Sequence, residues 1–485
     1  MEKVDWKKIE RIFFVGIKGV GMMPLSLIAK EAGYTIAGSD IPEEFITDEV
    51  LRKNNIRIFS DFKEERIEDF FQGIPSEKSL LITTGAHRGY DNPQVKKAQA
   101  LNIQVLNQGQ ALGIFISGEP FGRKLQGITV TGSHGKTTIS AMMASAFYRL
   151  NQDPSFAVGT SSIFPIGDSG HLGNGEYFIA EGDEYVGEPK YDRVPKILYQ
   201  KPKFAVINNI DFDHPDIYEN IEDVKNVMTR FVNGMQKSGI VFLNSDDKNL
   251  NDIRNNFRED IEIITYGEKD ADYVISDVLE NIGNIHFEVS TRNRNMGDFV
   301  LNVPGRHNAK NALAVVALLD TLEISDEDKK QAVSFYKGCR RRMELVGMTE
   351  TGAQVLDDYG HHPTEIISTL NALKKFYNKK IICVFQSHTY SRTKEFLKEF
   401  SESFGEAEEL VLIPVFKSQR DTEHDIISYG EFSESFRKNL KKVYTAKDIS
   451  DAVEYLKHKK YNDEYIILTI GAGDVYKVGY ELKIE

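Results

Sequence analysis

The 485-residue chain is 41% hydrophobic and 27% charged, which is ordinary for a soluble globular protein of roughly two to four domains. Its formal net charge of −13 argues against a partner of duplex nucleic acid, because phosphate contacts need a basic face. The two cysteines, Cys339 and Cys383, are too few for a disulfide framework or a cysteine-ligated zinc site. The charged N-terminus lacks a signal peptide and no apolar run is long enough to cross a membrane, so we expect a cytoplasmic protein with no membrane partner.

The first segment, residues 1–123, has the alternation of strands and helices typical of a parallel α/β sheet. Apolar runs at residues 11–15, 35–40 and 80–84 have strand length, and a helical pattern covers residues 22–28. This rhythm predicts a parallel sheet, because parallel strands need crossover helices.

A glycine-rich turn lies between the first strand and the first helix of this segment. It contains Gly16, Gly19, Val20 and Gly21, and Asp40 closes the next strand, where a ribose-binding acid would lie. The glycine spacing is not that of a dinucleotide fingerprint. One interpretation is a diphosphate site at the helix N-terminus, and the alternative is a tight turn that only packs the helix on the sheet.

The strongest local signal opens the second segment, residues 124–324. A strand at residues 127–131 runs into a glycine turn and then a helix, and a second buried strand is predicted at residues 204–208. Glycines let backbone N–H groups face a phosphate, a lysine supplies charge for the outer phosphates, and a hydroxyl can coordinate Mg²⁺. This motif predicts a phosphate loop, although Val130 stands where a Walker A loop would have its first glycine. Its residues are Gly132, Ser133, His134, Gly135, Lys136, Thr137 and Thr138.

Two acidic clusters follow apolar runs of the same segment. One begins at Glu181, and the other covers residues 208–214 and ends at His214. Carboxylates and a histidine at strand ends suit Mg²⁺, which prefers oxygen ligands and bridges phosphates. Either cluster alone would more often be a helix cap, but a phosphate loop in the same segment favours a metal site.

The last segment, residues 325–485, contains three further buried-strand patterns at residues 380–385, 409–413 and 465–469. Arginines at 340–342, a run from Asp357 through Tyr359 to His361, and the group from His388 to Arg392 follow or flank its strands. Arginine can clamp phosphate or carboxylate, but each group could equally be a solvated loop.

Taken in order, these motifs resemble the Mur ligase family over nearly the whole chain. The resemblance implies three domains: a Rossmann-like UDP-sugar domain at residues 1–123, a central ATPase domain at 124–324 with a mostly parallel sheet, and a Rossmann-like amino-acid-binding domain at 325–485. Lys18 departs from the family by replacing a glycine of the first turn.

The resemblance also assigns roles. The UDP-sugar would bind at Gly16, Gly19, Val20, Gly21 and Asp40. ATP would bind at residues 132–138, His307, Asn308, Asn311, Arg341 and Asp357. Mg²⁺ would be held by Thr137, Glu181 and His214. The amino acid would bind at Tyr359, His361, His388 and Arg392, and the residues closest to the chemistry would be Lys136, His214, Arg341, His388 and Arg392.

The reaction implied by the resemblance is ATP-dependent amide formation through an acyl phosphate, with Mg²⁺ or Mn²⁺ as the metal. UDP-N-acetylmuramate would supply the carboxylate and L-alanine the amine, and the protein would be a monomer or homodimer. The C-terminal motifs are similar to those of the family's alanine-adding members. More similar to members that attach a murein tripeptide to the same sugar, which is the alternative, are residues 181–185, 190–196, 213–217 and 341–344.

Three other classes explain less of the sequence. A nicotinamide-dependent oxidoreductase would use the turn at Gly16 but leaves the loop at residues 132–138 unexplained. A P-loop switch or motor explains that loop but not the first segment. A nucleotide-binding regulator without catalysis has no feature against it, since sequence does not report turnover.

Overall fold

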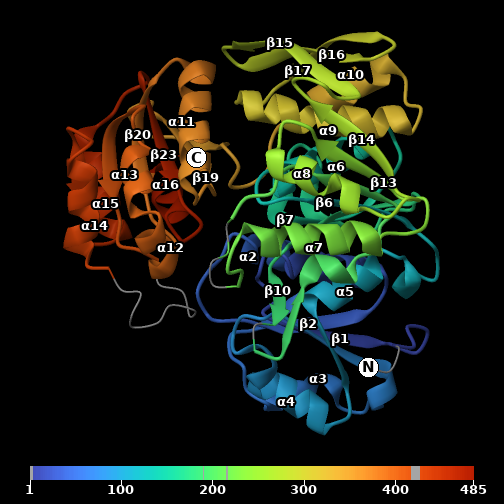
Figure 1. Cartoon of the computed structure of the whole chain (residues 1–485). Coiled ribbons are helices and arrows are strands. Elements are labelled where there is room, and N and C mark those ends of the chain that lie inside the picture. The colour runs from blue at the N-terminus through green and yellow to red at the C-terminus, as the bar shows by residue number, and fades with distance from the viewer. Residues whose placement is uncertain (1–3, 189, 213, 215–216, 417–426, 485) are drawn as a thin grey trace. The chain divides into compact units, whose positions relative to one another are not determined.

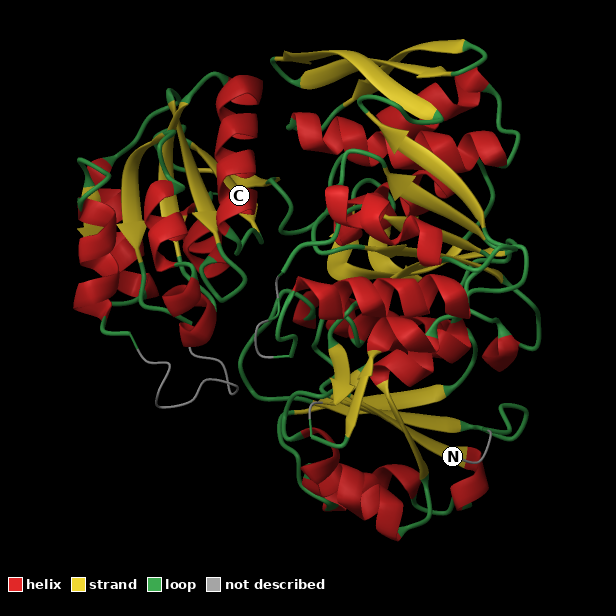
Figure 2. Cartoon of the chain, viewed as in Figure 1, coloured by secondary structure: helices red, strands yellow, loops and turns green. Residues whose placement is uncertain are grey.

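The structure is a computed structural model that describes residues 4–188, 190–212, 214, 217–416 and 427–484. It contains two compact units, one formed by Met1–Ser276, Val289–Gly297 and Asn311–Tyr336, the other by Asp277–Glu288, Asp298–Lys310 and Lys337–Glu485. Helices cover mostly parallel sheets (Figures 1 and 2), so the predicted α/β fold class is confirmed. Within these described residues, no helix has the length and apolarity needed to span a bilayer.

The first segment forms a five-stranded parallel sheet with the order β3-β2-β1-β4-β5. Strand β1 lies at its centre and pairs with β2 and β4. The turn that follows β1 therefore lies at the topological switch point, where the strand order changes direction across the sheet. The strands are β1 (Arg11–Val15), β2 (Thr35–Ser39), β3 (Arg57–Phe59), β4 (Ser79–Thr83) and β5 (Gln104–Asn107), and the helices are α1 (Met23–Glu31), α2 (Asp48–Lys53), α3 (Glu65–Phe71), α4 (Pro93–Ala100) and α5 (Gln108–Phe115).

The central segment forms a ten-stranded sheet with the order β17-β16-β15-β14-β13-β12-β6-β9-β7-β8. Its middle strands are parallel, and β6 lies between β12 and β9. The strands are β6 (Gln126–Thr131), β7 (Ser155–Ile163), β8 (Gly167–His171), β9 (Tyr177–Glu181), β12 (Phe204–Ile207), β13 (Ile240–Asn244), β14 (Glu262–Gly267), β15 (Tyr273–Asn281), β16 (Asn284–Thr291) and β17 (Asn295–Leu301). The helices are α6 (Lys136–Arg149), α7 (Ile221–Gly234), α8 (Lys248–Ile253), α9 (Arg306–Thr321) and α10 (Asp326–Phe335), and β10 (Val186–Glu188) and β11 (Asp192–Pro195) form a separate antiparallel hairpin.

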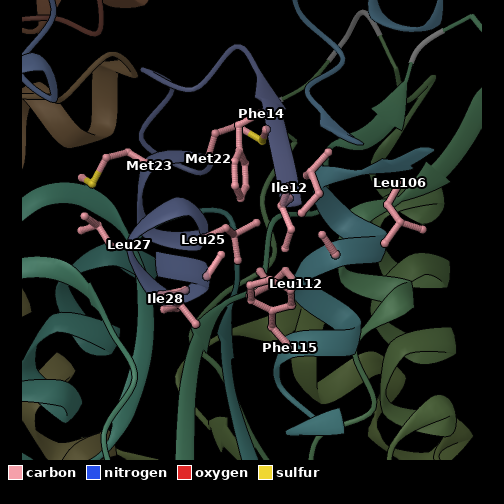
Figure 3. Packing of buried hydrophobic residues seen from close by; sticks show 14 of the residues in the cluster. Ile12, Phe14, Met22, Met23, Leu25, Leu27, Ile28, Leu106, Leu112 and Phe115 are labelled. Atoms are coloured by element: carbon pink, nitrogen blue, oxygen red, sulfur yellow. The ribbon is translucent and has the colours of Figure 1, made fainter. Parts of the chain in front are cut away.

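The first two segments share one hydrophobic cluster. Side chains of α1 and α5 pack beneath β1 (Figure 3), and the same cluster includes Phe178 and Ala180 of β9. Helix α1 also contacts β7 and β8. A continuous apolar core ties the glycine turn after β1 to the central sheet, because displacing either part would expose buried side chains to water.

The last segment forms a six-stranded sheet with the order β18-β19-β23-β20-β21-β22, parallel except at β18. Its strands are β18 (Glu344–Met348), β19 (Gln354–Asp358), β20 (Lys380–Phe385), β21 (Ala407–Leu412), β22 (Val443–Thr445) and β23 (Tyr465–Ile470). Apolar clusters cover both faces, as the uninterrupted hydrophobic runs of its strands require. Its helices are α11 (Pro363–Tyr377), α12 (Tyr390–Glu395), α13 (Leu397–Glu402), α14 (Tyr429–Arg437), α15 (Ile449–Lys459) and α16 (Tyr476–Leu482).

The domain boundaries at 123/124 and 324/325 stay predictions. Helix α10, which begins just after the second of them, packs against α6, where Phe335 stacks on Tyr148. The compact unit that contains β6 and α6 includes Asn311–Tyr336, and therefore α10.

We expect Phe385→Ala to lower the free energy of unfolding of the last segment by about 3–5 kcal/mol, because it leaves a cavity among four other phenylalanines. Urea unfolding followed by circular dichroism measures the change. Ile367→Ala, at a position 44% exposed on α11, is the matched control and should change stability by less than about 0.5 kcal/mol. Equal losses in both variants would contradict this packing.

Candidate functional site

The predicted phosphate loop is a tight turn that joins β6 to α6. Gly132 and Gly135 have φ values of +127° and +83°, which residues with a side chain rarely adopt. A Cβ on Gly132 would lie 2.9 Å from the backbone of Asn209, and one on Gly135 would lie 2.6 Å from the amide nitrogen of Asn208. Both positions therefore need glycine, for conformation and for space.

Two asparagines after β12 hold this turn in place. Asn209 accepts from the His134 N–H at 2.8 Å, and the side chains of Asn208 and Asn209 each donate to the His134 carbonyl at 3.1 Å. Ser133 exchanges two hydrogen bonds with the backbone of Asp211, its hydroxyl donating at 3.0 Å and accepting at 2.8 Å. The turn is thus fixed by the neighbouring strand end before any ligand is bound.

Lys136, the first residue of α6, turns back over the loop. Its Nζ donates to the carbonyls of Gly132 at 2.7 Å and Ser133 at 3.1 Å, and lies 3.0 Å from a carboxylate oxygen of Glu184. Burial by itself would lower the pKa of Lys136, but the carboxylates of Glu184, Asp183 and Glu181 outweigh burial and raise that pKa. The lysine therefore stays a cation at neutral pH.

Thr137 and Glu181, two of the predicted metal ligands, lie together. The Thr137 hydroxyl donates to one Glu181 carboxylate oxygen at 3.0 Å, and the other oxygen accepts from the Gly159 N–H at 2.9 Å. His214, the third predicted ligand, lies 3.8 Å from Glu184 and packs edge-on against Tyr185. Hydroxyl and carboxylate oxygens at one point suit a hard divalent cation. Asp213, part of the predicted acidic run, lies outside the described residues.

Helix α9 carries the three residues predicted on the adenine side. Asn308 is buried and donates to the Pro304 carbonyl at 2.7 Å, and buried Asn311 accepts from the Asn208 side chain at 3.3 Å. Burial lowers the pKa of His307 to about 4, so this ring is neutral at physiological pH. Thr138, in the first turn of α6, is partly buried.

The first glycine turn is fastened from within by a residue that the prediction treated only as a departure. The Lys18 N–H donates to Asp40 at 2.8 Å, and its Nζ, which is buried, lies 3.0 Å from Asp48 and donates to the carbonyls of Ile41 and Glu43. Asp40, the predicted ribose-binding acid, is 2% exposed and also accepts from the Ile41 N–H. Its carboxylate organises the turn. Gly16 has φ +79°, and Gly19, Val20 and Gly21 complete the turn before α1.

In the second unit, Arg341 and Asp357 form a buried ion pair at the end of β19. The guanidinium lies 2.9 Å from Asp357 and donates to the carbonyls of Gly471 and Gly473, and Thr469 donates to the same carboxylate at 2.6 Å. Every one of these contacts ties strand ends of one sheet together. The ion pair therefore stabilises the ends of these strands. For Arg341 or Asp357 to bind a nucleotide, the side chain would have to give up some of these contacts.

The four residues predicted to bind the amino acid also lie in the second unit. The Tyr359 and His361 rings are 5.3 Å apart, and the His361 N–H donates to Glu365. His388 stacks on Phe416, and Arg392, which is 8% exposed, lies in α12 one turn after it.

The structure brings most predicted residues into three groups: the loop at residues 132–138 with Glu181, His214 and Asn311; the turn from Gly16 to Gly21 with Asp40; and the residues from Arg341 to Arg392 in the second unit. Sequence analysis missed Glu184, Asn208 and Asn209 as partners of the loop. They stand in or beside the acidic runs it noted, but the pairing of β6 with β9 and β12 is needed to assign them.

Three family descriptions match the chain one after another. "Mur ligase family, catalytic domain" matches residues 11–119, "Mur ligase middle domain" residues 130–319 and "Mur ligase, glutamate ligase domain" residues 341–473. A protein of Caldanaerobacter subterraneus named UDP-N-acetylmuramate–L-alanine ligase is 34% identical over 479 residues, which cover 98% of each chain. A protein of Clostridium acetobutylicum with the same name is also 34% identical, over 97% of this chain and 96% of its own.

Solved structures have the same fold. The UDP-N-acetylmuramate-alanine ligase of Thermotoga maritima superimposes with a TM-score of 0.79 at 24% identity, covering 97% of this chain and 98% of that one. A murein peptide ligase from Psychrobacter arcticus gives a TM-score of 0.71 at 20% identity, covering 98% of both chains. The matched family descriptions and the relatives at 34% identity show that the chain belongs to the Mur ligase family.

We expect His307 to contribute a specific acid sensitivity. Its pKa is about 4 in the folded protein and 6.5 ordinarily, so as pH falls below 6.5 the unfolded chain binds the proton first. The contribution of His307 to the free energy of unfolding is fully present above pH 6.5. It falls by about 1–2 kcal/mol between pH 6.5 and 4, after allowance for the partial exposure of the ring. His307→Gln should remove this part of the pH dependence in urea unfolding at pH 7 and 5. His458→Gln, at an exposed position, should leave it unchanged, and identical pH profiles for both variants would contradict the assignment.

Proposed function

We propose that this chain uses ATP to join L-alanine to the carboxylate of UDP-N-acetylmuramate in peptidoglycan precursor synthesis. The observation that carries the reaction type is Lys136, a permanent cation on a glycine turn between strand and helix, with Thr137 and Glu181 beside it. Sequence identity of 34% to proteins named for that reaction, over 97–98% of this chain, supports the choice of substrates.

The proposed reaction has two steps. A carboxylate oxygen of the sugar nucleotide attacks the γ-phosphorus of ATP. The bond between that phosphorus and the β,γ-bridging oxygen breaks, so that ADP is released and an acyl phosphate is formed. The neutral amine of L-alanine then attacks the acyl carbon and loses a proton, while the bond to phosphate breaks. Lys136 stabilises the charge on the transferred phosphoryl group once it exchanges Glu184 for phosphate, and the backbone of the turn keeps its shape because Asn208 and Asn209 hold it.

Mg²⁺, or Mn²⁺ in its place, would neutralise phosphate charge when bound. Thr137 and Glu181 would hold it, since their oxygens already lie 3.0 Å apart, and His214 would serve a second ion. The remaining assignments complete the proposal: the UDP-sugar at the turn from Gly16 to Gly21, ATP also at His307, Asn308, Asn311, Arg341 and Asp357, and a cytoplasmic location that the substrates would require.

The amine site is proposed at Tyr359, His361, His388 and Arg392. Arg392 is buried in the first turn of α12 and could pair with the carboxylate of a small amino acid through its planar fork. A tripeptide carries its carboxylates farther from the attacking amine, so the same fork would be misplaced.

Phosphate release tests the reaction type. Wild-type protein should release phosphate only with ATP, Mg²⁺, UDP-N-acetylmuramate and L-alanine together, and Lys136→Ala should lower the rate at least about 10³-fold because it removes a charge aimed at the transition state. Lys78→Ala, which removes an exposed partner of Glu10, is the control and should retain full activity. Phosphate release by folded Lys136→Ala at the wild-type rate would exclude a phosphate-loop role.

A competition assay tests the acceptor. With L-alanine and L-Ala-γ-D-Glu-meso-diaminopimelate at equal concentration, we expect the alanine product to dominate, and a dominant tripeptide product would select the murein tripeptide ligase instead. Arg392→Ala should raise the KM for L-alanine at least about tenfold more than the KM for ATP, because it removes a charge-assisted pair to the amino acid alone. Arg437→Ala, an exposed arginine of α14, should change neither constant.

A further inference from the structure

Lys196 is a cation beside the phosphate loop that neither the sequence motifs nor the assigned roles explain. It follows β11, and its N–H donates to the Tyr185 carbonyl at 2.9 Å. Its Nζ lies 2.8 Å from Asp183 and 5.7 Å from the centre of the Tyr185 ring, whose edge meets His214. The Lys196 ammonium therefore lies against the short turn at residues 183–185, which also includes Glu184, the carboxylate partner of Lys136.

A chain of contacts joins Lys196 to the first glycine turn. Gln108, the first residue of α5, donates from its side chain to the Gly21 carbonyl at 3.3 Å. The next residue, Gly109, approaches Lys196 so closely that a Cβ there would lie 2.9 Å from the lysine Cα. The start of α5 thus touches the candidate sugar-nucleotide turn on one side and Lys196 on the other, while Lys196 touches the phosphate-loop cluster through Asp183.

The two lysines of this region differ in how their donors are used. Lys136 donates to two backbone carbonyls and to Glu184. Lys196 has three donor hydrogens, and across the described residues Asp183 supplies its one carboxylate or carbonyl acceptor. Its side chain is 19% exposed, so it is neither buried in the core nor free in solvent. Two donor positions remain for a ligand.

We propose that Lys196 binds the carboxylate of the sugar nucleotide and holds it against the γ-phosphate. This rests on the proposed function. Carboxylate and phosphate are both anions and repel one another, so a cationic side chain between them favours their approach. Lys196 contacts α5, which also contacts the sugar-nucleotide turn, and it contacts Asp183, which lies beside the phosphate loop. It therefore lies between the two turns, where the carboxylate of the sugar nucleotide must approach the γ-phosphate.

A structural role predicts something different. If Lys196 served only to neutralise Asp183, replacing it would leave an unpaired carboxylate, and Asp183→Asn would repair the damage. If Lys196 binds substrate, that second substitution repairs nothing.

Binding of two sugar nucleotides separates these roles. UDP-N-acetylglucosamine lacks the lactyl carboxylate of UDP-N-acetylmuramate, so calorimetry with each ligand isolates the carboxylate contact. Wild-type protein should bind UDP-N-acetylmuramate at least about tenfold more tightly, as expected for a charge-assisted pair. Lys196→Met should abolish this preference, leave UDP-N-acetylglucosamine affinity within about twofold, and lower kcat about 10²-fold with little change in the KM for ATP.

The controls cover folding and position. Lys190→Met, on the same hairpin in an exposed pair with Asp91, should keep the preference. Lys196→Met with Asp183→Asn removes both charges, so it folds without an unpaired carboxylate, and it should still lack the preference. Lys196→Cys should regain it after alkylation with 2-bromoethylamine, since both native cysteines are buried.

Three results would overturn the proposal: no carboxylate preference in the wild type, a preference retained by Lys196→Met, or preference restored by Asp183→Asn. Failure of the proposed function has another signature, which is the absence of phosphate release from wild-type protein whatever the variants bind.

Discussion

The candidate site depends on one constraint, the register of β6 between β12 and β9. Thr131 pairs with Ile207 on one side, and Val130 pairs with Glu181 on the other. Parallel strands end at the same edge, so Asn208 and Glu181 necessarily flank the turn that leaves β6. The asparagine fixes the loop backbone, and the glutamate meets Thr137. A slip of one residue in either pairing would turn these side chains to the other face and leave the glycine turn without support.

The same register explains how far sequence could go. The turn at Gly132–Gly135 and the strands that end beside it were predictable, because glycine spacing, a lysine and apolar runs are local signals. The partner of Lys136 was not, because Glu184 is 48 positions away and only strand pairing brings the two together. Lys18 shows another limit. The sequence marked it only as a residue in place of a glycine, whereas in the structure Asp48 and two carbonyls enclose its ammonium, and local sequence could not assign these partners.

The helix α10 shows a third limit. The predicted boundary at 324/325 lies just before this helix, whose first turn is acidic. Which sheet the helix joins is decided by packing, and its contacts with α6 assign it to the central unit. A comparable contact unites the first two segments, since Phe178 of β9 belongs to the cluster around α1 and α5. The apolar faces that cross a predicted domain boundary fix the distance between the two glycine turns, whereas the polar loops between the strands set what each turn can bind.

Charge balance gives the final constraint on the chemistry. Glu181, Asp183 and Glu184 face Lys136 and Lys196, so the cluster already carries one net negative charge. Although burial raises the pKa of Asp183, the two lysines outweigh burial and lower that pKa, so this carboxylate stays ionised at neutral pH. A triphosphate that enters such a site competes with Glu184 for Lys136 and adds further negative charge. Separation by a few ångströms in a partly buried site makes that repulsion large. A divalent cation bound with the triphosphate would offset this repulsion, and oxygen ligands such as Thr137 and Glu181 are of the kind such a cation takes.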